Sequence, residues 1–550
     1  MKPQPYDVLI IGAGINGAGL FRDLCEQGVS CAIVDKADFG SGTSAAPSRL
    51  IHGGLKYLET GEFGLVAQST LERNLLLKNA PHLVSPLPTI IPIFSWFKGI
   101  GASLRTLLGS TTTPRSRGAF LVKVGLSIYD YYGSRHGVMP RHTMMSKKRA
   151  LRDMPKLTKS IVATGIYHDA KIHNPERLVF ELISDGLAAN DQSYAANYAT
   201  FAGLSEGVLS YELKSTTIKI KPKILINAAG PWIDHVNQQL GAITQLIGGT
   251  KGSHILLGHA ELVKNLDGRM IYFEGNDGRV CLVFEYLGQA LVGSTDIPDR
   301  DPDGVTCDEA EIDYMLDSLR QLLPEMSFDR DQITYVYSGI RPLPASDSKN
   351  PGLISRDHSS PLLEPTQERP FSITSLVGGK WTTFRGFAEE VADQVLERLD
   401  RKRRLSTQSL PIGGGLNFPL NTRERTQWVN EVSQSSGLTH EAVDLLLTRY
   451  GTTAKRIAHH QLHSQPCETL PNSDYTTQEI DFIVRNEWVE SLLDVVLRRT
   501  DLAITNALSI ESLKAIAEIA AKSLGWDDNR KVGEINNALD YLKKRNFMRL

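Results

Sequence analysis

Apolar residues near the N-terminus are arranged as a strand, a helix and a second strand. Residues 6–11 (YDVLII) form the continuous apolar run of a buried strand. Residues 18–27 are helix-like, and residues 30–34 return to an apolar run. Short apolar runs on either side of a helical pattern are typical of parallel strands with a crossover helix. The pattern therefore predicts a βαβ unit at the start of the chain.

A glycine-rich turn connects the first strand to the helix and fits G-x-G-x-x-G. Gly12 makes the tight turn, Gly14 lets the backbone approach a pyrophosphate, and Gly17 allows close packing of helix and strand. The free N–H groups at the helix N-terminus attract phosphates. Asp35 follows Gly17 by eighteen residues, where a carboxylate accepts hydrogen bonds from a ribose hydroxyl. These positions predict a dinucleotide site.

Later segments complete the expected architecture. Residues 223–227 and 371–377 have the apolar character of further strands in the parallel sheet, and residues 382–399 should form a helix. Four short β-rich runs predict an antiparallel sheet inserted into the first domain: residues 253–257, 270–273, 280–286 and 290–293. After a basic and glycine-rich linker the pattern is helical, and we expect a separate helical domain over residues 405–550.

Composition narrows the class of protein. The chain has 550 residues and a net charge of −2, which gives no indication of nucleic-acid binding. Its five cysteines are scattered without a C-x-x-C pair, which favours a reducing compartment and argues against disulfides, iron–sulfur clusters and metal sites. No signal peptide and no membrane-spanning segment are expected, so the chain is soluble or lies on a membrane surface.

Positive charge is concentrated in one region. Residues 98–159 contain thirteen Lys and Arg against only Asp130 and Asp153, and apolar stretches at 100–108 and 120–132 are interleaved with them. Such a segment docks on anionic lipid headgroups or forms a solvated basic face, and charge alone does not distinguish the two.

Several motifs, taken in order, resemble one family. Residues 42–44 (GTS) and 48–59 (SRLIHGGLKYLE) closely resemble the flavin-contacting segment of the FAD-dependent glycerol-3-phosphate dehydrogenases. Further matches follow in the family's order at residues 226–232, 251–255, 293–296, 338–343, 355–357 and 378–383. The similarity is dense over residues 5–400 and fainter through the helical tail.

The resemblance implies an α/β fold: an FAD-binding Rossmann-like domain, an inserted antiparallel-sheet substrate domain and a C-terminal all-helical domain. It places the FAD-binding domain at 1–90, 150–245 and 335–400, and the substrate-binding cap at 91–149 and 246–334. Together with the glycine motif it assigns FAD to Gly12, Gly14, Asn16, Gly17, Asp35, Lys36, Gly42, Thr43, Ser44, Ser48, Leu50, His52, Gly53, Ala229, Gly230, Trp232, Gly379, Lys380 and Thr382.

The family's activity becomes the expectation for this chain. Its members oxidise sn-glycerol 3-phosphate at C2 to dihydroxyacetone phosphate, and they pass the electrons to a quinone at the membrane surface, commonly as dimers. We therefore expect a phosphorylated polyol substrate, a quinone acceptor and a homodimer. The expected location is cytoplasmic, with peripheral attachment to the anionic surface of the cytoplasmic membrane.

Five residues are candidates for substrate chemistry. Arg341 is the first candidate to grip the substrate phosphate, and Arg356 and Lys56 are further ones. Lys380, in a Gly-Gly-Lys turn before a helix, is placed to offset negative charge on reduced flavin. His254 is the candidate base for the C2 hydroxyl proton.

Alternatives remain open at this point. His52 is a second candidate for the base. The family usually has arginine at the position of Lys56, and lysine loses the bidentate fork, so another polyol phosphate is a possible substrate. An oxidase that returns electrons to oxygen, and a flavin-binding interaction module without catalysis, are the remaining readings.

Overall fold

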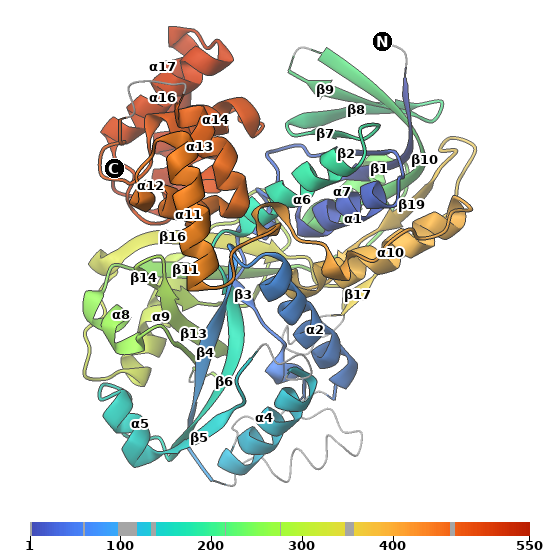
Figure 1. The fold of residues 1–550 in the computed structure, drawn as a ribbon. Coiled ribbons are helices and arrows are strands. Elements are labelled where there is room, and N and C mark those ends of the chain that lie inside the picture. The colour runs from blue at the N-terminus through green and yellow to red at the C-terminus, as the bar shows by residue number, and fades with distance from the viewer. Residues whose placement is uncertain are drawn as a thin grey trace.

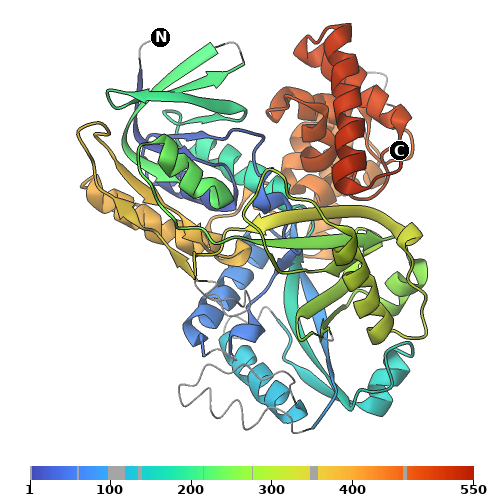
Figure 2. The same ribbon diagram turned by 180° about the vertical axis from the view of Figure 1, so that it is seen from behind.

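Three units are packed together in the computed structural model, which describes residues 3–58, 61–96, 118–133, 139–214, 216–275, 277–346, 357–462 and 468–550. A sheet domain with the N-terminus, a second and larger sheet, and a helical C-terminal domain are seen from two sides in Figures 1 and 2. None of the helices in these described stretches combines the length and hydropathy that a membrane span requires.

The first sheet contains the predicted βαβ unit. Its strands lie in the order β18 (Leu362–Leu363), β19 (Ser372–Ser375), β10 (Thr216–Asn227), β1 (Gln4–Ile11), β2 (Cys31–Val34) and β7 (Tyr194–Ala196). All neighbours in this path are parallel except β18 and β19, and Val8 on β1 is in register with Cys31 on β2. The parallel placement is confirmed for residues 223–227 and, within 371–377, for Ser372–Ser375.

Alternate side chains of β1 face different layers. Val8 and Ile10 are buried with the helices α1 (Ile15–Glu26), α6 (Pro175–Ala189) and α10 (Phe384–Arg398). Leu9 faces the other side, where the hairpin β8 (Ala199–Ser205) and β9 (Val208–Leu213) packs together with α7 (Ile233–Gln239). A strand with both faces covered must be apolar at every position, as residues 8–11 are.

The second sheet has the strand order β15 (Ile297–Pro298), β11 (Thr250–Leu257), β14 (Gln289–Gly293), β13 (Val280–Tyr286), β12 (Met270–Glu274), β4 (Val84–Ile93), β6 (Ala163–Ile172) and β3 (Leu50–Ile51). Strand β16 (Ile333–Arg341) pairs with β11, and β5 (Thr143–Ser146) pairs with β6. The pairs are antiparallel except β12 and β4. The four predicted β-rich runs are confirmed as β11 to β14.

The expected domain boundaries stay a prediction, although part of the expected FAD-binding domain contributes strands to this sheet. Residues 84–90, 163–172 and 335–341 were expected in the FAD-binding domain, but they lie in β4, β6 and β16 of the second sheet. The reason is the ten-residue antiparallel pairing that runs from Val84↔Ile172 to Ile93↔Ala163. Pairing between strands so far apart in the chain leaves no signal in the local pattern of either one.

Helices surround the second sheet. On one face lie α5 (Lys147–Asp153), α8 (Ala260–Leu266) and α9 (Glu309–Leu322). Residues of α2 (Phe63–Asn79) and α4 (Ala119–Gly133) form a separate cluster with Ile91 and Tyr167.

The C-terminal domain is helical, as expected. Its elements are α11 (Thr422–Ser436), α12 (His440–Tyr450), α13 (Ala454–Leu462), α14 (Thr477–Asn486), α15 (Leu492–Asp494), a π-helical turn (Val495–Arg499), α16 (Ile510–Leu524) and α17 (Asp528–Asn546). Apolar side chains of α14 to α17 share one cluster with Leu256, Phe284 and Tyr335 of the second sheet. The domain is thus packed directly on that sheet.

Candidate active site and dinucleotide cavity

A cavity of about 950 Å³ opens at the carboxyl ends of β1, β2 and β10. This is at the upper end of the range of about 300–1,000 Å³ for ligand pockets, and it lies where open α/β sheets bind ligands. Thirteen of the residues assigned to FAD from the sequence line it: Gly12, Gly14, Asn16, Asp35, Lys36, Gly42, Thr43, Ser44, Ala229, Gly230, Trp232, Gly379 and Lys380. Gly17, Ser48, Leu50, His52, Gly53 and Thr382 do not.

The glycine turn has no room for side chains. Gly12 has φ +102°, and a Cβ there would lie 2.5 Å from the carbonyl oxygen of Ala228. A Cβ on Gly17 would lie 2.0 Å from the carbonyl oxygen of Gly12. Helix α1 therefore begins directly against the cavity, with Gly14 as a cap that has no side chain. Its first-turn N–H groups and dipole favour a phosphate at this end.

Asp35 is fixed by the backbone around it. Its carboxylate accepts hydrogen bonds from the N–H of Ala13 at 2.7 Å and of Ala37 at 3.0 Å. Apart from the surface that it presents to the cavity, Asp35 is enclosed, and this burial raises its pKa to about 6. A carboxylate has more than two lone-pair sites, so Asp35 retains acceptor capacity for a ribose hydroxyl.

A polar bridge lies at the cavity beside Asp35. The Lys36 ammonium is 3.0 Å from a carboxylate oxygen of Asp303, which also accepts from the indole N–H of Trp232 at 3.1 Å. The ammonium lies 4.2 Å from the centre of the Trp232 ring. All three residues line the cavity, so two motifs of the first domain meet a loop of the second at this point.

The loop after Asp35 is held by hydrogen bonds from three directions. Ser44 Oγ accepts from the N–H of Ile15 at 2.9 Å, and the Ser44 carbonyl accepts from the Trp381 indole at 3.2 Å. Arg49, at φ +57°, makes a buried bidentate ion pair with Glu176 at 2.8 and 3.1 Å. Sequence reasoning missed this pair, because its two members are 127 positions apart.

A buried polar cluster supports the segment of His52 and Gly53. The N–H of Gly53 donates to Asp169 Oδ1 at 3.0 Å and to the Tyr129 hydroxyl at 2.9 Å. Arg73 Nη1 lies 3.1 Å from Asp169 Oδ1. This cluster, too, was not predicted from the sequence. The available signal was a carboxylate at position 169 inside an apolar strand pattern, where a buried charge needs a partner.

His254 lies on β11 and is almost fully buried. Its Nε2 is 2.8 Å from Ser48 Oγ, and its ring stacks on Tyr337 at 4.9 Å between centroids. Burial lowers the pKa of His254 well below its usual value, and the charges of Arg341 and Arg49 lower it further. The ring is therefore neutral at physiological pH. Its Nδ1 has no hydrogen-bond partner among the described residues.

Arg341 ends β16 one strand away from His254. Its guanidinium donates to Ser294 Oγ and to Asp296 Oδ1, both at 3.1 Å. A Cβ on Gly252 would lie 2.0 Å from Arg341 Nη2, and a Cβ on Gly293 would lie 2.2 Å from the His254 ring. The two glycines thus make space for these two side chains. Neither His254 nor Arg341 lines the cavity itself.

Lys380 connects two motifs that are distant in sequence. Its ammonium lies 3.2 Å from Ser69 Oγ and 3.6 Å from the centre of the Tyr57 ring. The Tyr57 ring in turn stacks on His52 at 6.4 Å. Lys380 lines the cavity, so the Tyr57 ring links His52 to a residue of the cavity wall. Lys56 is half-buried and does not line the cavity, and Arg356 lies outside the described residues.

Comparison with known proteins decides the family. A family model described as FAD dependent oxidoreductase matches residues 7–394, and one described as the C-terminal domain of alpha-glycerophosphate oxidase matches residues 405–531. The glycerol-3-phosphate dehydrogenase of Synechocystis sp. is 31% identical over 567 aligned positions, covering 98% of this chain and 96% of that protein. The chain belongs to the FAD-dependent glycerol-3-phosphate dehydrogenase family.

Further relatives agree with this membership. The aerobic glycerol-3-phosphate dehydrogenase of Staphylococcus haemolyticus is 28% identical, covering 99% of this chain and 96% of that protein. The crystal structure of the Bacillus halodurans glycerol-3-phosphate dehydrogenase complexed with FAD has the same fold, with a TM-score of 0.75 at 22% identity, covering 99% of this chain and 95% of that one. The resemblance and the fold class inferred from the sequence are confirmed, and FAD is the cofactor.

The cavity fits this cofactor. Gly12 and Gly17 have no room for a Cβ atom. Without side chains at this turn, the backbone can approach the diphosphate of a dinucleotide closely. Asp35 retains acceptor capacity for a ribose, and Lys380 adds a positive charge to the cavity wall.

Proposed function

We propose that this family member oxidises sn-glycerol 3-phosphate at C2 to dihydroxyacetone phosphate and passes the electrons to a quinone. The main support is the whole-chain similarity to glycerol-3-phosphate dehydrogenases together with a half-buried arginine, Arg341, whose guanidinium lies beside a neutral histidine. When bound, FAD supplies the two-electron acceptor for the hydride from C2. The protein must then bind the phosphate and remove the hydroxyl proton.

Phosphate binding is assigned to Arg341. A phosphate dianion is best held by a forked, charge-assisted donor, and Arg341 keeps 23% of its side chain exposed. Its neighbours Ser294 and Asp296 orient the guanidinium. Lys56 and Arg356 stay proposals as additional phosphate ligands.

Proton removal needs an uncharged base within hydrogen-bond reach of the C2 hydroxyl. His254 satisfies the charge condition, because its pKa is lowered well below the usual value. His52 is the second candidate, since it is half-buried and lies near Lys380 through the Tyr57 ring. Asparagine substitution of each histidine separates the two, because only loss of the base slows flavin reduction without weakening substrate binding.

Lys380 is assigned to charge stabilisation. Lys380 is the N-cap of a 3₁₀ turn (Trp381–Thr383) that continues into α10. Its ammonium group and the positive end of the α10 dipole therefore lie at the same end of the helix. Reduced flavin carries negative charge, and Lys380 together with the N-terminus of α10 would stabilise that charge when FAD is bound.

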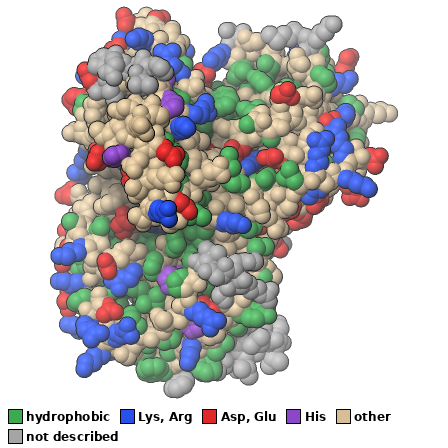
Figure 3. Space-filling view, in the orientation of Figure 1, with side chains coloured by type: hydrophobic (Ala, Val, Ile, Leu, Met, Phe, Trp, Pro, Cys, Tyr) green, Lys and Arg blue, Asp and Glu red, His purple; other side chains and the backbone are tan. Residues whose placement is uncertain are grey.

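Transfer to a quinone requires contact with a membrane, and one surface is suited to it. Phe120, Val124 and Tyr131 on α4 are 55%, 42% and 62% exposed, although they are large apolar residues. Figure 3 shows Lys and Arg side chains over α5 beside exposed hydrophobic side chains. Exposed apolar side chains on a helix suit a peripheral membrane site, and basic side chains in the same region of the chain suit anionic headgroups. Much of the basic region, residues 97–117 and 134–138, lies outside the described residues.

The membrane proposal is tested with vesicles of phosphatidylglycerol and phosphatidylcholine. Replacing Phe120 and Tyr131 by serine should weaken cosedimentation, whereas Ile243→Ser, at a 95% exposed position on another part of the surface, should not. Equal binding by both variants would exclude α4 as the docking face.

The homodimer expected from the family resemblance is a further proposal. Sedimentation of the detergent-free protein tests it.

The reaction is tested with glycerol 3-phosphate that carries deuterium at C2. We expect dihydroxyacetone phosphate as product and a primary isotope effect on flavin reduction. Quinone-dependent dye reduction should exceed peroxide formation in air. Peroxide as the main product would identify an oxidase instead. Faster turnover of a longer polyol phosphate would support the alternative substrate that Lys56 suggests, and absence of any turnover would indicate a flavin-binding module.

A further inference from the structure

The wall of the dinucleotide cavity includes residues from outside the domain that binds dinucleotides in this fold. The family model for the FAD-dependent oxidoreductases ends at residue 394. Four residues of the C-terminal helical domain nevertheless line the cavity: Ser491, Leu493, Arg498 and Tyr541. They come from α15, the π-helical turn after it, and α17. Two independent sets of contacts hold these elements against the cavity.

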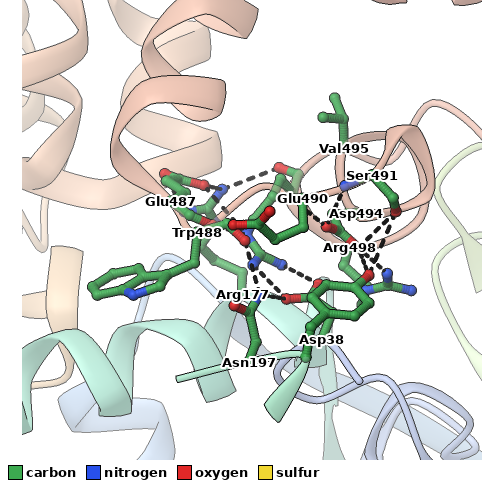
Figure 4. A network of polar contacts seen from close by, with 12 residues as sticks. Asp38, Arg177, Asn197, Glu487, Trp488, Glu490, Ser491, Asp494, Val495 and Arg498 are labelled. Atoms are coloured by element: carbon green, nitrogen blue, oxygen red, sulfur yellow. Dashed lines mark hydrogen bonds and ion pairs between the residues drawn. The ribbon is translucent and has the colours of Figure 1, made fainter. Parts of the chain in front are cut away.

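The first set is centred on Asp38, three positions after Asp35. Its buried carboxylate accepts from Arg498 Nε at 2.6 Å, from Arg499 Nη1 at 2.8 Å and from Asn197 Nδ2 at 3.0 Å (Figure 4). Burial alone would raise the pKa of Asp38, but the two guanidinium groups outweigh it and lower the pKa to about 2. Asp38 is therefore ionised at any physiological pH, and the loop after Asp35 is fixed to the helical domain by a desolvated ion pair.

A second carboxylate completes this network. Asp494 accepts from the hydroxyl of Tyr198 and from Arg498 Nη2, each at 2.5 Å. The backbone N–H of Ser491 donates to Asp494 at 2.9 Å. Tyr198 lies in the cavity wall at the start of β8, and its N–H donates to the carbonyl of Ala37 at 3.1 Å. The helical domain thus positions both the loop and the tyrosine at the Asp35 end of the cavity.

The second set of contacts involves α17. Arg545 donates to the carbonyl oxygens of Asp303 at 2.8 Å and of Val305 at 2.6 Å. Asp303 is the acid that bridges Lys36 and Trp232 at the cavity. Tyr541, one helical turn before Arg545, lines the cavity while 41% of it is exposed. Helix α17 therefore supports the polar bridge and adds an aromatic ring to the same wall.

We propose that the C-terminal helical domain is a structural part of the FAD site and retains the cofactor at its adenosine end. The Asp38 ion pairs hold the helical domain in place. Tyr541 and Arg498 form a part of the cavity wall to which the sheet domain contributes no residues. FAD release then requires displacement of this wall. The proposal concerns cofactor binding only and is independent of the substrate and of the electron acceptor.

The decisive variant is Tyr541→Ala, because an exposed ring is removed without emptying a core. Val532→Ala is the matched control, since Val532 lies on the same helix, is 53% exposed and does not line the cavity. Apoprotein of the full chain is titrated with FAD and followed by quenching of flavin fluorescence. We expect Tyr541→Ala to raise the FAD dissociation constant about tenfold, about 1.4 kcal/mol, and Val532→Ala to change it less than twofold. Equal dissociation constants for the two variants would overturn the proposal.

Asp38→Asn tests the ion pairs, with Gln289→Met as its control. Gln289 Nε2 donates to the carbonyl of Ile504 at 2.7 Å, so this control breaks a contact between the same helical domain and the second sheet, away from the cavity. Asp38→Asn should speed FAD dissociation at least tenfold, whereas Gln289→Met should lower only the unfolding midpoint. Slow FAD dissociation from a folded Asp38→Asn variant would contradict the proposal. If that variant does not fold, the Tyr541 comparison alone decides.

Discussion

Replacement of Arg341 by methionine tests the assignment of the substrate phosphate. Methionine keeps the length and apolar stem of the side chain but removes the charge and the fork. A charge-assisted hydrogen bond contributes about 1.5–3 kcal/mol. At about 1.4 kcal/mol for each factor of ten, loss of this contact should weaken glycerol 3-phosphate binding roughly 10- to 150-fold. Arg341→Lys keeps a point charge but lacks the forked guanidinium, so its affinity for glycerol 3-phosphate should lie between those of Arg341→Met and the wild type.

The loss must depend on the phosphate. Anaerobic stopped-flow reduction of the flavin gives the substrate dissociation constant and the limiting rate separately. We expect Arg341→Met to affect glycerol 3-phosphate strongly and unphosphorylated glycerol hardly at all. Arg330→Met is the control, because Arg330 pairs with Asp313 on the surface of the same domain and is 46% exposed. An equal loss for both alcohols, or no loss for either, would refute the assignment.

Three further predictions concern the cofactor site and its support. Gly17→Ala should yield protein without bound flavin, because its Cβ would meet the Gly12 carbonyl at 2.0 Å; absorbance of the purified protein measures this, and normal flavin content would contradict it. FAD affinity should fall as the pH drops through about 6, because Asp35 then gains a proton and loses acceptor strength, and Asp35→Asn should remove this pH dependence in a fluorescence titration. Tyr129→Phe should lower the free energy of unfolding by about 1–3 kcal/mol in a urea titration, because it removes one acceptor from the buried N–H of Gly53; an unchanged midpoint would show that Asp169 alone suffices.

The dinucleotide half of the site was predictable because its information is local. The strand, the glycine turn, the helix and Asp35 lie within residues 4–35, and each step has its own signature in residue type and spacing. The later strand that ends at Asn227 was found for the same reason, since it is apolar on both faces. Helix α10 after the Gly-Gly-Lys turn followed from its amphipathic pattern.

The features that could not be predicted depend on contacts between residues that are far apart in the sequence. The assignment of β4 and β6 to the second sheet depends on their mutual pairing, which no local pattern encodes. Asp38 and Arg498 are 460 positions apart, and each taken alone has the character of an ordinary surface charge. Burial, which turns such a pair into a specific contact, is a property of the packed chain. The helical tail therefore gave no sign of its place in the cavity wall.

Candidate substrate residues fall between these two cases. Their motifs were recognisable, yet their relation in space depended on the register of β11 with β16, which places Thr250 opposite Arg341. That register puts Arg341 close enough to His254 to lower the pKa of the histidine. Lys380 meets Tyr57 through packing of segments more than 300 positions apart, so its link to His52 came only from the structure.

Every assignment of substrate chemistry above depends on one reaction, in which bound FAD accepts two electrons from a small phosphorylated alcohol. Anaerobic titration of the purified holoprotein with glycerol 3-phosphate, glycerol and erythritol 4-phosphate tests it most directly. We expect complete bleaching of the flavin by glycerol 3-phosphate, at far lower concentration than by either of the other two. Bleaching by glycerol at the same concentration, or a flavin that stays oxidised with every phosphorylated alcohol, would contradict it.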